Sequence, residues 1–218
     1  MNRLLVATRS RGKQVEFRAL LAPLGCEIVF PDDIRLTQSA EEDTLERFET
    51  FEECARAKAA WFASRSGLVT LADDSGLEVD ALGGEPGVRS KRFAGRDGPD
   101  HLVTAANNDM LLARLSGVPL AARTARYRCV LVRHDPVTHA EMMTVGTTEG
   151  RIAEALQGSG GFGYDPLFVS EELGVTFGVA SRAAKGAVSH RGRAAAAMVA
   201  ALKGAGNRQE PRIGSGRD

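Results

Sequence analysis

Cysteine is scarce in this chain of 218 residues, which has only Cys26, Cys54 and Cys129. They are widely spaced and odd in number, so they match neither a disulfide framework nor a cysteine metal site, and they suit a reducing cytoplasm. Net charge is also absent, because 28 Lys and Arg residues balance 28 Asp and Glu residues. Nucleic-acid binding usually calls for a basic excess. We therefore expect no nucleic-acid partner, and any anion site must be local.

Long apolar runs are missing as well. The run at residues 4–7 is too short for the apolar core of a signal peptide, and no run approaches the ~20 residues of a membrane span. Hydrophobic residues still make up 43% of the chain and charged residues 26%, which is typical of a globular protein. We expect no membrane partner, one domain over residues 1–203, and a disordered tail over the Gly- and charge-rich residues 204–218.

The most informative stretch is an acidic pair after an apolar run. Residues 68–71 have the composition of a buried strand, and Asp73-Asp74 then stands where that strand should end. Ser75-Gly76 favours a turn, and residues 77–81 alternate as a second strand would. Ligands bind where strands end in an open α/β sheet. Two carboxylates there suit Mg²⁺, whereas an isolated Asp-Asp pair is more often a solvated turn.

A basic loop near the N-terminus has the layout of a phosphate site. A strand over residues 3–7 precedes it, and a helix carrying the apolar stripe Phe17, Leu20, Leu21 and Leu24 follows. Loop N–H groups and a helix N-terminus attract anions, to which a lysine adds charge. The spacing is not that of a Walker A loop, and an ordinary basic surface loop is the alternative. The loop consists of Thr8, Arg9, Ser10, Arg11, Gly12 and Lys13.

Two further segments carry candidate groups. A helix predicted over residues 44–64 places Lys58 at nearly the azimuth of the buried Phe51, so Lys58 either snorkels to solvent or reaches an anion in a cleft. The glycine-rich residues 158–168 allow close backbone approach to a ligand. Within them, Phe162 or Tyr164 either stacks on a nucleobase or packs into the core.

The last helix is predicted to begin at Ser189 as its N-cap and to run to about residue 203. His190 and Arg191 then lie at a helix N-terminus, which disfavours cations unless an electron-rich group lies opposite. Such a local conflict is expected at functional sites. Between these segments the pattern predicts strands at 25–30, 122–133 and 140–148, extended by 149–153, with a turn at 134–139 and a helix at 99–115.

Taken together, these motifs resemble one family over residues 3–202. The matching segments are 7–8 with 12–13, 50–53 with 58–59, 72–77, 87–88 with Ser90 and Arg92, 160–166, and 189–192. The chain is similar to the pyrophosphatases of non-canonical purine nucleoside triphosphates, the inosine and xanthosine triphosphatases of the Ham1-like family. The resemblance implies an α/β fold with an elongated mixed sheet flanked by helices, two lobes with a central substrate cleft, and a homodimer. It also implies Mg²⁺-dependent hydrolysis of inosine, deoxyinosine and xanthosine triphosphates to the monophosphate and pyrophosphate.

The resemblance also implies roles for residues. Asp74 is the general base and a metal ligand, supported by Asp73, and Glu41 is a second ligand with Glu42 as its competitor. Lys13 and Lys58 stabilise the leaving pyrophosphate, and Ser75 contacts the substrate. The phosphates are held by Thr8, Arg9, Ser10, Arg11, Gly12 and Lys13. The base pocket is formed by Phe162, Gly163, Tyr164, Asp165, Lys185, His190 and Arg191.

The chain departs from the family pattern at three places. Ser10 and Cys54 stand where Asn is usual, so a shorter hydroxyl and a weakly bonding thiol replace two amides. The segment between Glu41 and Thr50 is a few residues longer than typical. Two other functions remain open at this point. One is a Maf-type nucleotide pyrophosphatase acting on other bases, against which the motifs at 162–165 and 189–191 argue. The other is a purine-nucleotide-binding protein without catalysis, against which the retained carboxylates and lysines argue.

Overall fold

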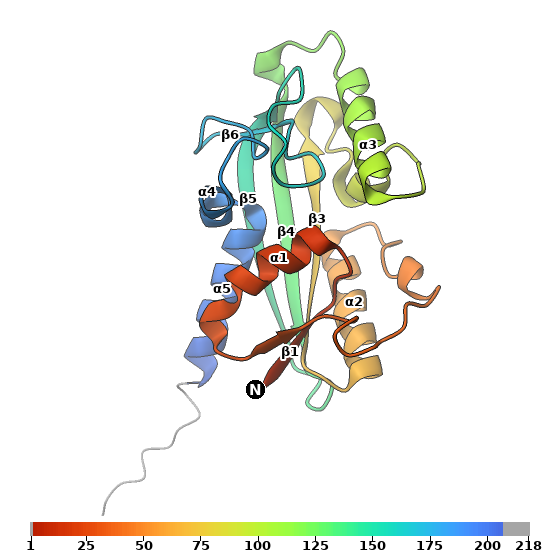
Figure 1. The fold of residues 1–218 in the computed structure, drawn as a ribbon, viewed down its shortest axis with the longest axis vertical. Helices are drawn as coiled ribbons and strands as arrows, with labels where there is room; N and C mark the ends of the chain where they lie inside the picture. Colours follow the sequence, from red (N-terminus) through yellow and green to blue (C-terminus); the bar gives the residue numbers. More distant parts are fainter. Residues whose placement is uncertain (1, 207–218) are drawn as a thin grey trace, which may run out of the picture.

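The computed structural model describes residues 2–206, which form a mixed sheet with helices on both faces (Figure 1). The strands are β1 Arg3–Val6, β2 Glu27–Val29, β3 Thr70–Val79, β4 Thr124–His134, β5 Glu141–Ile152 and β6 Phe168–Ser170. The α-helices are α1 Arg11–Leu20, α2 Phe51–Ser66, α3 Asp100–Arg114, α4 Arg182–Val188 and α5 His190–Gly206. Short 3-10 helices occupy η1 Ala22–Leu24, η2 Glu42–Thr44, η3 Asp80–Leu82, η4 Gly87–Arg92 and η5 Leu120–Ala122. None of the helices in this part of the chain is long and apolar enough to cross a bilayer.

The six strands are ordered β2-β1-β3-β4-β5-β6. β1 is parallel to β2 and β3, and the remaining pairs are antiparallel. The last pair between β1 and β3 is Val6 with Leu71, after which β1 ends while β3 continues. From that point on, no strand among the described residues pairs with this edge of β3, so the edge is open beside Asp73 and Asp74.

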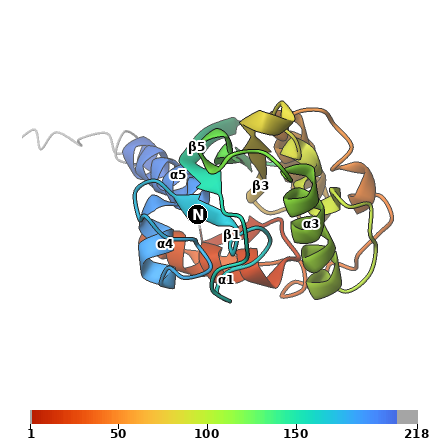
Figure 2. The same ribbon diagram turned by 90° about the horizontal axis from the view of Figure 1, so that it is seen from above.

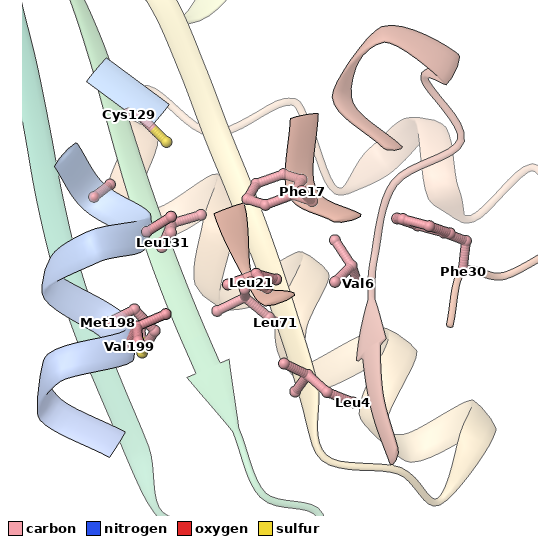
Figure 3. Packing of buried hydrophobic residues seen from close by; sticks show 12 residues of the cluster. Leu4, Val6, Phe17, Leu21, Phe30, Leu71, Cys129, Leu131, Met198 and Val199 are labelled. Carbon is pink, nitrogen blue, oxygen red and sulfur yellow. The ribbon is translucent and has the colours of Figure 1, made fainter. Parts of the chain in front are cut away.

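Each face of the sheet has its own apolar core. On one face, α1 and α5 pack over β1, β3 and β4 around Leu4, Phe17, Leu71 and Met198 (Figure 3). On the other face, α2 packs over the alternate residues of the same strands, among them Ala72 and Val130. A third cluster lies at the far end of the sheet, where α3 meets the segment before β6. The view from above shows α4 and α5 on one side of the molecule and α3 on the other (Figure 2).

Strand β3 corrects the prediction of a strand end and a turn at residues 75–76. It runs unbroken from Thr70 to Val79 and pairs with β4 along its whole length. Gly76 serves a different purpose from turning the chain. A Cβ at this position would lie 2.3 Å from the Gly87 carbonyl oxygen, so glycine lets η4 approach the strand, where Ser90 Oγ accepts a hydrogen bond from Leu77 N–H. The acidic pair is therefore in mid-strand, and the strand end beside it belongs to β1.

The start of α2 and the division of the last helix also differ from the predictions. The helix predicted from residue 44 begins at Phe51, because the Thr50 hydroxyl caps it by accepting from Glu53 N–H and donating to the Glu53 carboxylate. Before Ser189, the chain forms a separate helix, α4. The predicted N-cap is confirmed, since Ser189 Oγ accepts from Gly192 N–H. Helix α5 continues to Gly206, and the rest of the predicted tail lies outside the described residues.

A glycine in β5 sets the distance between α5 and the sheet. A Cβ on Gly146 would lie 2.1 Å from the His190 carbonyl oxygen and 2.5 Å from Ala194 N. We expect Gly146→Ala to displace the first turn of α5 and to cost about 1–3 kcal/mol in the free energy of unfolding, measured by urea denaturation. Gly186→Ala is the matched control, because a Cβ there meets nothing within 4 Å inside α4. Equal stabilities of the two variants would contradict this expectation.

Candidate active site

The two adjacent carboxylates point to opposite faces of β3. Successive side chains in a strand alternate between faces, so Asp73 shares the face of Leu71 with α1 and α5, and Asp74 shares the face of Ala72 with α2. Both lie beside the edge that β1 leaves open. A ligand lying across this edge can therefore contact groups from both layers of helices.

Asp73 is held by cations from α1 and α5. Its Oδ2 lies 2.8 Å from Lys13 Nζ and 3.5 Å from Arg191 Nη2, and it accepts a hydrogen bond of 3.0 Å from Ser75 Oγ. Burial alone would raise the pKa of this carboxyl, but Lys13, Arg191 and Lys58 outweigh burial and hold the pKa well below its usual range. Asp73 is therefore a permanent anion that positions Lys13.

Asp74 is held by one cation from α2. Its Oδ1 lies 2.6 Å from Lys58 Nζ, and Lys58 is also 3.6 Å from Glu46 Oε1. No described residue donates to the other oxygen of Asp74, Oδ2. Burial raises the pKa of Asp74 in spite of the nearby Lys58. A carboxylate with raised pKa and one free oxygen has the properties of a general base. The sequence left open whether Lys58 snorkels to solvent or reaches an anion. In the structure its side chain points inward and forms an ion pair with Asp74.

A second ionic cluster lies on the α1 and α5 face, next to the glycine-rich segment. Glu16 binds Lys185 through Oε1 and Arg191 through Oε2, and Lys185 also lies 2.6 Å from Asp165 Oδ2. Arg191 Nη2 donates to Ser75 Oγ at 2.8 Å. Together with Asp73 and Lys13, these contacts connect the cluster to β3.

Phe162 brings the glycine-rich segment against the first turn of α1. Its ring centroid is 4.8 Å from Lys185 Nζ and 5.5 Å from the guanidinium carbon of Arg191. A Cβ on Gly12 would lie 2.6 Å from this ring, so the glycine permits the contact. Phe162 N–H donates to Asp165 Oδ2 at 2.7 Å, which holds the segment in place. The candidate base-stacking residue is therefore next to the candidate phosphate loop.

The residues of the basic loop take different positions in the structure. Helix α1 begins at Arg11, so Gly12 and Lys13 are in its first turn and Ser10 is its N-cap residue, without a side-chain capping bond. Thr8 is buried beside the end of β1, and its Oγ1 accepts from Ser10 N–H. Arg9 leaves the loop, because its guanidinium binds Glu42 and Asp32. Arg11 is exposed. Arg9 is thus the member of the predicted phosphate-binding set that the structure directs elsewhere.

Glu41 and Glu42, the two candidates for the second metal ligand, do not lie beside Asp74. Glu41 accepts from Trp61 Nε1 and Arg65, and Arg65 is seven residues, about 10 Å of helix, beyond Lys58. Glu42 is bound to Arg9. The carboxylate that does approach Lys58 is that of Glu46. Among the described residues, no group of three or more His, Cys, Asp or Glu side chains is arranged to hold a metal, so Asp74 and Glu46 form a pair.

Tyr164 and Gly163, two members of the predicted base pocket, are bound by other parts of the protein. Tyr164 is buried in the third core, and its hydroxyl donates to the Ser90 carbonyl oxygen. The Gly163 carbonyl accepts from Asn108 Nδ2. Of the two aromatic residues, then, Tyr164 is the core residue and Phe162 the one at the site. Cys54 is also buried, with its Sγ 3.8 Å from the Phe48 carbonyl oxygen.

His190 is buried in a predominantly cationic environment. Its ring stacks on Tyr127 with centroids 4.5 Å apart, and its Nδ1 has no partner among the described residues. Arg191 Nε is likewise buried without a partner. Burial, helped by Arg191 and Lys185, lowers the pKa of His190 well below 6.5, with only weaker opposition from Asp73. The imidazole is therefore neutral in the folded protein at physiological pH.

This pKa shift predicts a loss of stability in mild acid. Below pH 6.5 the unfolded chain binds a proton at His190 that the folded chain does not, so the free energy of unfolding falls as pH decreases, by up to about 1.4 kcal/mol per pH unit. Urea denaturation between pH 7.5 and 5.5 measures the slope. We expect the slope to be smaller in His190→Gln and unchanged in His101→Gln, because His101 is exposed on α3. A wild-type slope in the His190→Gln protein would exclude His190 as the cause.

Two site residues were missed from the sequence. Glu16 is three residues after Lys13, and residues at i and i+3 share a helix face, so this spacing could have identified it. The helix predicted over residues 44–64 includes Glu46 in its first turn, because Thr50-Phe51-Glu52-Glu53 was not recognised as a capping motif. Recognising the cap would have placed Glu46 in the connection that precedes the helix.

Comparison with known proteins finds relatives over most of the chain. The model of the Ham1 family matches residues 4–201. A dITP/XTP pyrophosphatase of Exiguobacterium sibiricum is 44% identical over 201 residues, covering 92% of this chain and 96% of that protein. Another, from Geobacter sulfurreducens, is 44% identical over 198 residues, covering 91% and 95%. The structure of a HAM1 protein from Coxiella burnetii matches with a TM-score of 0.80 at 31% identity, covering 94% of this chain and 100% of that one.

Proposed function

The chain belongs to the Ham1 family, and from this premise we propose that it hydrolyses deoxyinosine, inosine and xanthosine triphosphates (dITP, ITP and XTP) to the monophosphate and pyrophosphate. The relatives at 44% identity are pyrophosphatases of dITP and XTP. The observation that carries the proposal is the open edge of β3, where Asp74 with Lys58 and Asp73 with Lys13 flank the first turn of α1. This removal of unusual purine nucleotides would cleanse the nucleotide pool.

The chemistry assigned to these residues is water attack on the α-phosphorus. Asp74 takes a proton from water through its free Oδ2, and the new oxygen–phosphorus bond replaces the bond from the α-phosphorus to the bridging oxygen. Lys13 and Lys58 neutralise the charge that develops on the departing pyrophosphate. Thr8, Ser10 and the N–H groups at the start of α1 hold the phosphates. Positioning and charge stabilisation of this kind supply most of the catalysis in phosphoryl transfer.

Magnesium is the metal that this site fits. Asp74 and Glu46 place two carboxylates around one ammonium group, that of Lys58, and Mg²⁺ commonly takes one or two carboxylates together with substrate phosphates. When bound, the ion would neutralise phosphate charge and polarise the phosphorus centre. We propose Asp74 and Glu46 as its protein ligands, in place of the pair of Asp74 with Glu41.

Selection of the base is assigned to the cluster beneath Phe162. Lys185 and Arg191 are donors, and Arg191 Nε and His190 Nδ1 are buried without partners, as expected where a ligand completes the hydrogen bonding. A 6-keto oxygen accepts from such donors, whereas the 6-amino group of adenine presents another donor. Unpaired buried polar groups of this kind discriminate strongly between substrates. Phe162 supplies a ring face against which a base can stack.

A substrate panel tests the function. Pyrophosphate release with Mg²⁺ is measured for dITP, ITP, XTP, ATP and GTP at equal concentrations. We expect release from the first three and little from ATP. Equal efficiency with ATP and ITP would contradict the assignment of the base pocket, and activity confined to other bases would favour a Maf-type enzyme. Nucleotide binding without turnover would identify a purine-nucleotide-binding protein.

We also propose a homodimer formed through β5. The face of β5 on the α2 side exposes Met143 and Val145, and β6 pairs with β5 only at residues 150–152. We expect light scattering to give the mass of two chains and Val145→Lys to shift the protein toward one. Unchanged mass for that variant would place the contact elsewhere.

The free cysteines fit a cytoplasmic location. We also propose residues 1–203 as one two-lobed functional unit around a central substrate cleft, because β3 and β4 run the length of the sheet.

A further inference from the structure

A hollow of about 480 Å³ opens beside Glu46, outside the residues assigned to the reaction. One wall is the connection before α2, with Arg47, Phe48 and Glu49, and the other is η4, with Val88, Arg89 and Arg92. Three guanidinium groups thus line the hollow with a single carboxylate, that of Glu49. The hollow is therefore positively charged, although the net charge of the whole chain is zero.

The arginines of this hollow have donors to spare. The side chains of Arg47 and Arg89 make no hydrogen bond or ion pair with any residue between 2 and 206. Arg92 uses Nη2 to donate to the Glu46 carbonyl oxygen at 2.6 Å. A guanidinium presents a planar fork of donors that matches the oxygens of a phosphate group. A phosphate-containing anion is therefore the class of ligand that these groups fit.

The charged side chains of the candidate active site form a row of successive contacts, and the hollow lies at one end of this row. From Phe162, the row passes through Lys185, Glu16 and Arg191 to Asp73 and Lys13. On the other face it passes from Asp74 through Lys58 to Glu46, whose backbone carbonyl binds Arg92. Burial alone would raise the pKa of Glu46, but Lys58, Lys13, Lys91 and Arg92 outweigh burial and lower it. In this series of contacts, Phe162 and the arginine hollow are the two ends.

We propose that the arginine hollow, walled by Arg47, Arg89 and Arg92, binds the pyrophosphate released by the reaction. The inference rests on the proposed function. When water adds to the α-phosphorus, the bond to the bridging oxygen breaks and pyrophosphate leaves with that oxygen and its charge. The monophosphate stays with the base end of the row. The guanidinium groups of Arg47 and Arg89, which lie beyond Glu46 and bind no described residue, are then available to the departing pyrophosphate.

Calorimetric titration of the protein with pyrophosphate, without nucleotide, tests the site. The Arg47→Gln/Arg89→Gln double variant is expected to bind pyrophosphate about tenfold more weakly than wild type, as loss of charge-assisted hydrogen bonds predicts. The inhibition constant of pyrophosphate against dITP hydrolysis should rise by the same factor, while that of deoxyinosine monophosphate stays constant. Arg3→Gln/Lys203→Gln removes the same charge from distant exposed positions and should bind like wild type.

Equal pyrophosphate affinity in wild type and in the Arg47/Arg89 variant would overturn the proposal, as would equal weakening in the Arg3/Lys203 control. Both arginines are exposed, so the fold should persist, and Arg47→Gln alone serves if the double variant loses thermal stability. The titration is independent of turnover. A wild-type protein that binds pyrophosphate through these arginines but does not hydrolyse dITP would contradict the proposed function and leave the anion site standing.

Discussion

Replacing Asp74 with Asn is expected to lower the turnover of dITP by a factor of about 10²–10⁴, the usual contribution of a general base. The amide keeps the shape of the side chain and can still accept from Lys58 Nζ at the position of Oδ1, but it cannot take the proton from water. Because the backbone pairing of Asp74 with Val130 is unaffected, the fold should persist. Steady-state kinetics and thermal unfolding of the same preparation separate catalysis from stability.

Asp80→Asn is the matched control for this variant. Asp80 lies just beyond the same strand, where it is exposed and binds Arg126 and Thr124. It loses the same charge without touching the candidate site, so its turnover should equal that of wild type. Near-wild-type turnover in Asp74→Asn would remove Asp74 from the role of base.

Replacing Arg191 with Met is expected to cost about 3–5 kcal/mol in the free energy of unfolding, because it removes one of the two cations that hold the buried Asp73 and one of the two that hold Glu16. Arg191 is 2% exposed and binds both Glu16 and Asp73. Turnover should fall as well, since Asp73 and Ser75 lose the group that fixes them. Urea denaturation at pH 7.5 measures the loss of stability.

The neighbouring arginine provides the comparison. Arg193 forms an ion pair with Glu172 in which both side chains are more than two-fifths exposed, and exposed pairs contribute about 1 kcal/mol or less. Arg193→Met should therefore cost much less than Arg191→Met. Similar losses in the two variants would show that burial of the Arg191 network does not determine its contribution.

Features that depend on local sequence could be predicted. The alternation and turn residues around residues 134–139 gave the β4–β5 hairpin, and the stripe of Phe17 and Leu21 gave α1. The N-cap at Ser189 followed from its side chain alone. These elements are specified by contacts within a few residues, so periodicity and capping rules apply to them directly.

Features that depend on contacts between distant segments could not be predicted from the sequence. Ser75-Gly76 has the composition of a turn, yet Gly76 is in a strand because η4 needs the space a side chain would occupy. Asp73 and Asp74 looked like one acidic pair, but the strand sends them to different helices. The choice of Glu46 over Glu41 depends on how the connection before α2 folds back toward Lys58. Tyr164 packs in the core because its hydroxyl donates a hydrogen bond to the carbonyl oxygen of Ser90, which is distant in sequence.

Hydrolysis of dITP in water enriched in ¹⁸O tests the central claim most directly, namely that water attacks the α-phosphorus at the open edge of β3. Mass spectrometry of the products should find one ¹⁸O in deoxyinosine monophosphate, with pyrophosphate as the unlabelled second product. Label in pyrophosphate, or release of single phosphate ions, would place the attack at another phosphorus and contradict the account.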